Sequence, residues 1–177
     1  MPTTRSKSDE AGATLASPAV GLTARRATQW WMGRAFGDSE ATSRVAPLPR
    51  RGIHRVLVCR VSHTLGNTLL VTPLIREIER VFPGAEIDVL TRSVVADDIF
   101  SGFDRIGSIL RLPAHGLSSP YRVASVLRAV RTRAYDLAID PGLLSTTDRV
   151  YVLAANAKWK VGYSSKFGGG LTHAFAA

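Results

Sequence analysis

The stretch Arg55 to Pro83, RVLVCRVSHTLGNTLLVTPLIREIERVFP, decides the fold. It opens with the short apolar run Val56 to Cys59, the pattern of a strand covered on both faces in a parallel sheet. Small and polar residues then interrupt the pattern from Ser62 to Asn67. Beyond them, apolar residues recur with helical spacing at Leu70, Leu74, Ile78 and Val81. A strand that feeds a helix through a loop is the first half of an α/β crossover, and ligands of open α/β sheets bind at such loops.

The start of this helix has two alternatives, because a proline lies near it. Pro73 either kinks a helix that begins at Asn67 or occupies the first turn of a helix capped by Thr72. Both alternatives keep the loop of residues 62–67 at the ligand-binding edge of the sheet.

The rest of the chain alternates strand and helix patterns. We expect strands over residues 86–90, 108–112, 136–140 and 158–163, and helices over residues 94–100, 119–134 and 145–157. Ser119-Pro120 and the capping-box spacing of Ser145 and Asp148 mark the starts of the last two helices. This order predicts an α/β fold, a Rossmann-like parallel sheet with crossover helices.

Composition limits the classes of protein that the chain can represent. With 177 residues, 45% hydrophobic and 21% charged, it has the length and composition of one globular domain plus a tail. The net charge of +9 favours anionic partners, but the arginines are spread out, so we expect no nucleic acid. The single cysteine, Cys59, excludes an internal disulfide framework and is expected to be an inert buried thiol. No secretory or membrane-spanning segment is evident, which by default indicates a cytoplasmic setting.

Residues 1–50 are expected to form a poorly ordered basic leader. Within it, residues 22–36 have the composition of a short basic helix that carries Trp30, Trp31 and Phe36. Such a helix is either an anchor at an anionic membrane surface or a segment docked on the domain, unless it has no stable structure at all.

The loop after the first strand supplies the first candidate site residues. Gly66 and Asn67 place backbone N–H groups at a helix start, which suits an anion; alternatively, Gly66 only makes a tight turn. His63 is either a general base or an ordinary exposed or hydrogen-bonded loop histidine. Asp140 ends the fourth strand, where it either meets ligand or caps the next turn.

Several signatures are missing from the sequence. Neither G-x-G-x-x-G nor G-x-x-x-x-G-K-[ST] occurs, which argues against a dinucleotide or nucleoside triphosphate fold. His54, His115 and His173 lack the spacing of metal ligands, so we propose no metal site.

Five segments resemble the amino-terminal domain of glycosyltransferase family 9, the ADP-heptose:lipopolysaccharide heptosyltransferases and their relatives. They are VLVxRxS at 56–62, LGNTLLxTPLIREI at 65–78, FPGAEIDVL at 82–90, YDLAID at 135–140 and KVGY at 160–163. The resemblance implies that residues 53–165 form the acceptor-side domain of an inverting GT-B enzyme that requires no metal.

The resemblance also implies roles for individual residues. The family places a catalytic aspartate directly after the loop glycine, where this chain has Asn67, an amide that orients a hydroxyl but accepts no proton at neutral pH. The base then lies elsewhere, with His63 the nearest candidate. Arg60 suits a phosphate or carboxylate of an anionic acceptor. The other expected substrate-binding residues are Ser62, Gly66, Thr68 and Asp140.

The donor-binding domain of the family has no counterpart in this sequence, and residues 166–177 read as a truncated tail. The domain is therefore expected to bind no cofactor itself, and an ADP-heptose-like nucleotide sugar would need the missing domain or a separate donor-binding chain. The expected partner is an anionic glycolipid or saccharide acceptor at the inner face of the cytoplasmic membrane, in lipopolysaccharide or surface polysaccharide synthesis. The alternative is a non-catalytic α/β binding module from a truncated or decayed gene.

Overall fold

A sheet of six parallel strands forms the centre of the computed structural model, which describes residues 47–113, 119–143, 145–163 and 170–175. The strand order is β3-β2-β1-β4-β5-β6, and every neighbouring pair is parallel. This order is the doubly wound arrangement of a Rossmann fold, so the predicted Rossmann-like parallel sheet is confirmed. The strands are β1 Arg55–Arg60, β2 Glu86–Thr91, β3 Ile106–Arg111, β4 Tyr135–Asp140, β5 Ala157–Tyr163 and β6 His173–Phe175.

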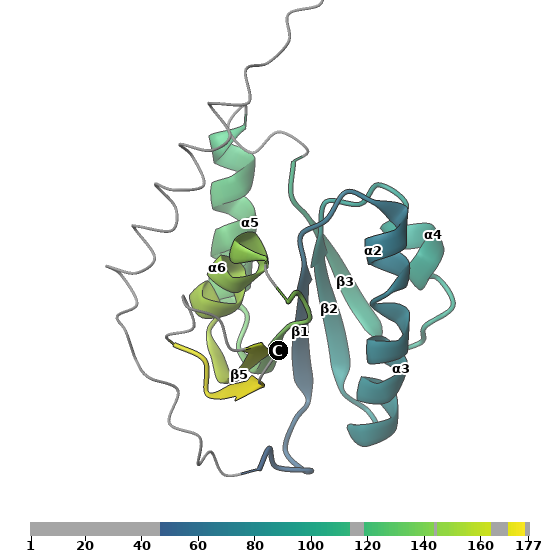
Figure 1. Ribbon diagram of the computed structural model, residues 1–177, viewed down its shortest axis with the longest axis vertical. Coiled ribbons are helices and arrows are strands. Elements are labelled where there is room, and N and C mark those ends of the chain that lie inside the picture. The colour runs from purple at the N-terminus through teal and green to yellow at the C-terminus, as the bar shows by residue number, and fades with distance from the viewer. Residues whose placement is uncertain (1–46, 114–118, 144, 164–169, 176–177) are drawn as a thin grey trace, which may run out of the picture.

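Helices cover both faces of the sheet (Figure 1). One face carries α2 Leu65–Leu69, α3 Thr72–Val81 and α4 Ala96–Phe100. The other carries α5 Pro120–Thr132 and α6 Thr146–Ala154. Helices α3, α5 and α6 lie close to their expected ranges, and each of them had been marked by an apolar face or a capping signal.

The central strand β1 contributes to two hydrophobic cores. Val56 and Val58 point into the core beneath α3, and Leu57 and Cys59 point into the core on the side of α5 and α6. All four side chains are fully buried. This explains why β1 is continuously apolar rather than alternating. Burial raises the pKa of the Cys59 thiol, as expected for an inert buried cysteine.

Each of the two alternatives for the helix start is correct in part. A helix, α2, does include Asn67, but it ends at Leu69, and a separate helix, α3, begins at Thr72 after the junction at residues 70–71. Pro73 occupies the first turn of α3, but the cap position is Val71 rather than Thr72. Proline has no N–H to give to the carbonyl of Leu69 four residues earlier, and the hydroxyl of Thr72 donates to that oxygen instead at 2.8 Å.

Several segments differ from expectation or lie outside the described residues. Strand β6 was not predicted; its three residues gain their order by pairing with β5, Val161 opposite His173. Leu48 packs against the core, so the folded part reaches upstream of residue 53. The leader before residue 47, including the helix expected at 22–36, lies outside the described part of the chain.

A buried aspartate in β2 joins the sheet to the end of α5. Asp88 accepts hydrogen bonds from the hydroxyl of Tyr135 at 2.7 Å and from Nη1 of Arg133 at 2.5 Å. Burial, followed by the bond to Asp88, raises the pKa of Tyr135. Asp88 is only 1% exposed, so its charge depends on these two partners.

We expect Asp88→Asn to lower the free energy of unfolding by about 2 kcal/mol, because it leaves the Arg133 guanidinium without its countercharge. This is below the cost of breaking a fully buried pair, since water screens Arg133, whose side chain is 32% exposed. Urea denaturation measures the change, and Asp104→Asn, at an exposed position, is the control with little effect. Equal losses in the two variants would contradict the role of the Asp88 contacts.

Candidate functional site

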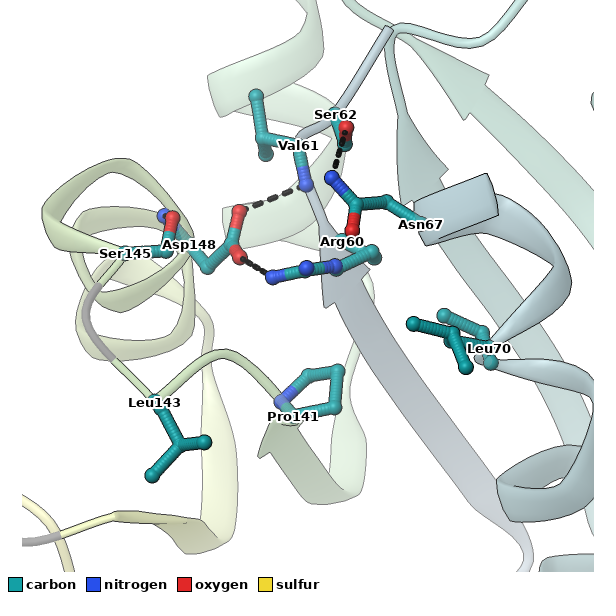
Figure 2. Close-up of a pocket in the computed structure, with 10 residues that line it drawn as sticks. Arg60, Val61, Ser62, Asn67, Leu70, Pro141, Leu143, Ser145 and Asp148 are labelled. Carbon is teal, nitrogen blue, oxygen red and sulfur yellow. Dashed lines mark hydrogen bonds and ion pairs between the residues drawn. The ribbon is translucent and has the colours of Figure 1, made fainter. Parts of the chain in front are cut away.

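A pocket of about 510 Å³ opens at the carboxyl edge of the sheet, between the ends of β1 and β4. The chain order reverses between these two strands, which is where doubly wound folds bind ligands. The pocket is lined by Arg60, Val61, Ser62, Asn67, Leu70, Val71, Pro141, Leu143, Ser145 and Asp148 (Figure 2).

The structure brings three of the expected site residues together in this pocket: Arg60, Ser62 and Asn67. The other four are not among the residues that line it. His63 is exposed on the loop after β1, and Gly66 is exposed in α2. Thr68 is buried beneath the loop, where its hydroxyl donates to the carbonyl of Thr64 at 3.1 Å. Asp140 is buried at the end of β4.

Ser62, in the loop after β1, and Asn67, in α2, lie side by side. Nδ2 of Asn67 donates to Oγ of Ser62 at 2.9 Å, and the backbone N–H of Thr64 donates to the same oxygen at 3.3 Å. The first contact is visible in Figure 2. Oγ of Ser62 also lies 3.1 Å from Oγ1 of Thr64, so this hydroxyl is hydrogen-bonded within the loop. The Asn67 carbonyl oxygen is the group of this pair that can accept a hydrogen bond from a ligand hydroxyl.

Arg60 and Asp148 point toward one another across the pocket (Figure 2). Nη1 of Arg60 lies 3.3 Å from Oδ2 of Asp148, while the backbone N–H of Val61 donates to Oδ1 at 2.6 Å. The Asp148 side chain is 1% exposed and that of Arg60 is 21% exposed. Burial raises the pKa of Asp148, and the Val61 N–H and the Arg60 charge oppose that shift.

A second ion pair lies beside the first. Oδ2 of Asp140 accepts from Nε of Arg149 at 2.8 Å, and its Oδ1 accepts from the backbone N–H of Gly142 at 2.9 Å. Arg149 also donates to the carbonyl of Tyr163 at 2.6 Å. Burial raises the pKa of Asp140. Asp140 thus caps the turn that follows β4, one of the two alternatives from the sequence, and its pair joins β4, α6 and β5.

Gly142 fits closely over the Arg60 and Asp148 pair. A Cβ at this position would lie 2.8 Å from both Nη1 of Arg60 and Oδ2 of Asp148, and 2.9 Å from Cβ of Ser145. The glycine is therefore required by close approach of the backbone to the ion pair.

Asp148 is the pocket residue that sequence reasoning missed. The capping box predicted that Ser145 caps α6, and Oγ of Ser145 does accept from the Asp148 N–H at 3.2 Å. The carboxylate does not complete the box; it binds the end of β1 instead. The sequence did contain a feature that could have identified it. Asp148 is an acidic residue in the first turn of the helix that follows β4, and the carboxyl end of β4 is part of the sheet edge where ligands are expected to bind.

Within the residues that the structure describes, no group of three or more His, Cys, Asp or Glu side chains is arranged to hold a metal ion. No helix in that part of the chain has the length and apolar character needed to cross a membrane.

We expect Gly142→Ala to lower the free energy of unfolding by about 1 to 3 kcal/mol, the usual cost of overpacking. The new methyl group would displace either Arg60 or Asp148, because it overlaps with the atoms that join them. Thermal and urea denaturation measure the loss. Gly102→Ala is the control, since a Cβ there meets nothing within 4 Å. Equal stability of both variants would contradict the close approach.

We expect Asp148→Asn to gain stability relative to the wild-type protein as the pH rises from 3.5 to 7. An aspartate whose folded pKa is raised above its unfolded value, about 3.9, stabilises the fold fully below that unfolded value and loses this contribution as the pH rises through the folded pKa. Asparagine does not titrate in this window. Urea denaturation of both proteins at several pH values in this range measures the difference between their free energies of unfolding. If the wild-type protein instead gained stability relative to Asp148→Asn as the pH rose, the prediction would be wrong.

No protein-family profile and no curated protein matches the sequence. Solved structures do match the fold. Heptosyltransferase WaaC from E. coli, determined with ADP, is 19% identical with a TM-score of 0.51; the match covers 62% of this chain and 34% of that one. A family 9 glycosyl transferase from Veillonella parvula DSM 2008 is 18% identical with a TM-score of 0.53; the match covers 68% of this chain and 34% of that one.

These similarities concern the fold, at an identity below one fifth. The chain spans about a third of the length of both structures. It therefore has the α/β fold of one part of these glycosyltransferases.

Proposed function

We propose that residues 53–165 are the acceptor-binding domain of an inverting, heptosyltransferase-like glycosyltransferase that acts in lipopolysaccharide or surface polysaccharide synthesis. One observation carries the proposal: Arg60, Ser62 and Asn67, which the sequence resemblance assigned to acceptor binding, meet in one pocket at the switch point of the sheet. The fold similarity to two glycosyltransferases supports it.

The nucleotide-sugar donor belongs to another part of the enzyme in this proposal. We assign an ADP-heptose-like donor to a second domain, in the same polypeptide or in a separate chain, because the matched structures are about three times as long as the matching region. The acceptor is a saccharide or glycolipid, reached at the inner face of the cytoplasmic membrane.

The chemistry is a displacement at the anomeric carbon. The acceptor oxygen forms a bond to that carbon, the bond to the nucleotide diphosphate breaks, and the hydroxyl proton passes to a base. Asn67 orients the hydroxyl, with its amide fixed by Ser62. His63 is exposed on the loop after β1, four residues before Asn67, and we retain it as the candidate base.

A second candidate function is a non-catalytic saccharide-binding module. Asn67 favours it, because an amide stands where a transferase of this kind has its carboxylate base. The two functions share the acceptor pocket and differ in whether transfer occurs when a donor-binding domain is supplied.

Binding of acceptor saccharide and of nucleotide tests the proposal on the 177-residue chain. We expect calorimetry or ligand-observed NMR to detect binding of lipopolysaccharide core oligosaccharide but not of ADP. Asn67→Ala should weaken the saccharide affinity by about fivefold or more, the effect of one lost hydrogen bond. Asn156→Ala is the matched control, because Asn156 is exposed and directly precedes the amino end of β5, at the edge of the parallel sheet opposite the pocket. Binding of ADP without saccharide would overturn the acceptor assignment.

A further inference from the structure

We infer that the acceptor group that enters this pocket is electrically neutral, a hydroxyl-bearing sugar ring rather than a phosphate or carboxylate. The inference rests on the proposed acceptor-binding function and specifies the chemical class that the pocket selects. It departs from the anionic contact that the sequence suggested for Arg60.

The charges that line the pocket cancel. Of its ten lining residues, only Arg60 and Asp148 carry a formal charge, +1 and −1. The two are paired at 3.3 Å, so the arginine already has an anion beside it. An incoming phosphate would meet the positive guanidinium and the negative carboxylate together, and the repulsion from the second largely offsets the attraction to the first. The net charge of +9 therefore does not extend into this pocket.

The carboxylate is fixed in place and cannot give way to a ligand. Its Oδ1 is held by the Val61 N–H at 2.6 Å, and its Oδ2 lies beneath Gly142, where even a methyl group would not fit. Release of Asp148 from this position would leave the Val61 N–H without its acceptor. A competing anion would have to offset that cost as well.

The remaining lining suits a pyranose ring. The hydroxyl of Ser145 and the amide of Asn67 provide uncharged donors and acceptors, and the hydroxyl of Ser62 holds the Asn67 amide in place. Leu70 and Leu143, which also line the pocket, are 74% and 53% exposed, and they offer apolar surface to the C–H groups of a sugar. Small-molecule sites usually combine a few polar groups with a larger apolar surface. The uncharged polar groups of this pocket can all hydrogen-bond to a neutral ligand.

The test compares a neutral and an anionic probe on the full chain by ¹⁵N NMR at pH 7.5. The probes are methyl α-D-mannopyranoside and inorganic phosphate, and the reporters are the side-chain signals of Asn67 Nδ2 and Arg60 Nε. We expect the glycoside to shift the Asn67 signal in a saturable manner and phosphate to leave the Arg60 signal unchanged at equal concentration.

Asp148→Asn separates the charge of the carboxylate from its shape. The variant keeps an oxygen for the Val61 N–H but gives the pocket a net charge of +1, so phosphate should bind about tenfold more tightly than to the wild-type protein. Asp104→Asn makes the same change at an exposed position and should leave phosphate binding unchanged.

Three results would count against the inference. Saturable phosphate binding at Arg60 in the wild-type protein would overturn the neutral-ligand assignment while leaving the acceptor function intact. Phosphate affinity that falls in Asp148→Asn would overturn it too, since it would mean that the carboxylate positions Arg60 for an anion. Failure of the glycoside to shift Asn67 would overturn the acceptor function itself. The wild-type comparison decides the question alone if the variant does not fold.

Discussion

The site depends on one carboxylate that reaches across the sheet edge, from the first turn of α6 to the backbone just beyond β1. Asp148 and Val61 are 87 residues apart in sequence, and their hydrogen bond is 2.6 Å long. A carboxylate buried to this degree is costly unless each oxygen is satisfied. Here Oδ1 accepts a hydrogen bond from the Val61 N–H, and Oδ2 accepts one from Arg60. The hydrogen bonds of this one carboxylate therefore hold β1, the loop after it and α6 together.

At the carboxyl edge of the sheet, an aspartate accepts a hydrogen bond from the backbone after a strand in two places. Where a parallel strand ends, the next backbone N–H groups lose their partners in the sheet, and they must find other acceptors. Asp148 accepts from the residue after β1, and Asp140 accepts from Gly142 after β4. Each acid also takes one arginine, Arg60 or Arg149. The pair that contains Arg149 is buried and joins three elements, whereas the pair that contains Arg60 borders the pocket. Of two similar ion pairs, one is thus buried within the fold and the other borders the candidate site.

Local patterns predicted what depends on local forces. The apolar run at Val56 to Cys59 and the helical spacing after Leu70 specified β1 and α3, and alternation of such units specified the parallel sheet. Ser145 was identified as a cap because capping involves residues three apart.

Contacts between distant parts of the chain could not be predicted from local sequence patterns. The strand at β6 forms only because β5 provides an edge, and three residues carry no periodicity. Asp88 lies within the strand predicted over residues 86–90, but its partners Arg133 and Tyr135 lie 45 and 47 residues away. The hydrogen bond from the Val61 N–H to the Asp148 carboxylate could not be predicted for the same reason, since the two residues are 87 positions apart. Thr68, expected at the ligand, bonds to its own helix start instead.

Asn67 acquires a physical meaning once the charges around it are counted. A carboxylate at that position would join Asp148 in the same lining and give the pocket a net charge of −1, with Arg60 alone to balance two acids. With an amide, the lining is neutral and the Asn67 side chain donates to Ser62, a contact that a carboxylate could make only as an acceptor. The Asn67 side chain can therefore orient a hydroxyl group but cannot accept its proton at neutral pH. Under the proposed function, recognition of the acceptor hydroxyl and removal of its proton would therefore fall to different groups, Asn67 for the first and a base elsewhere for the second.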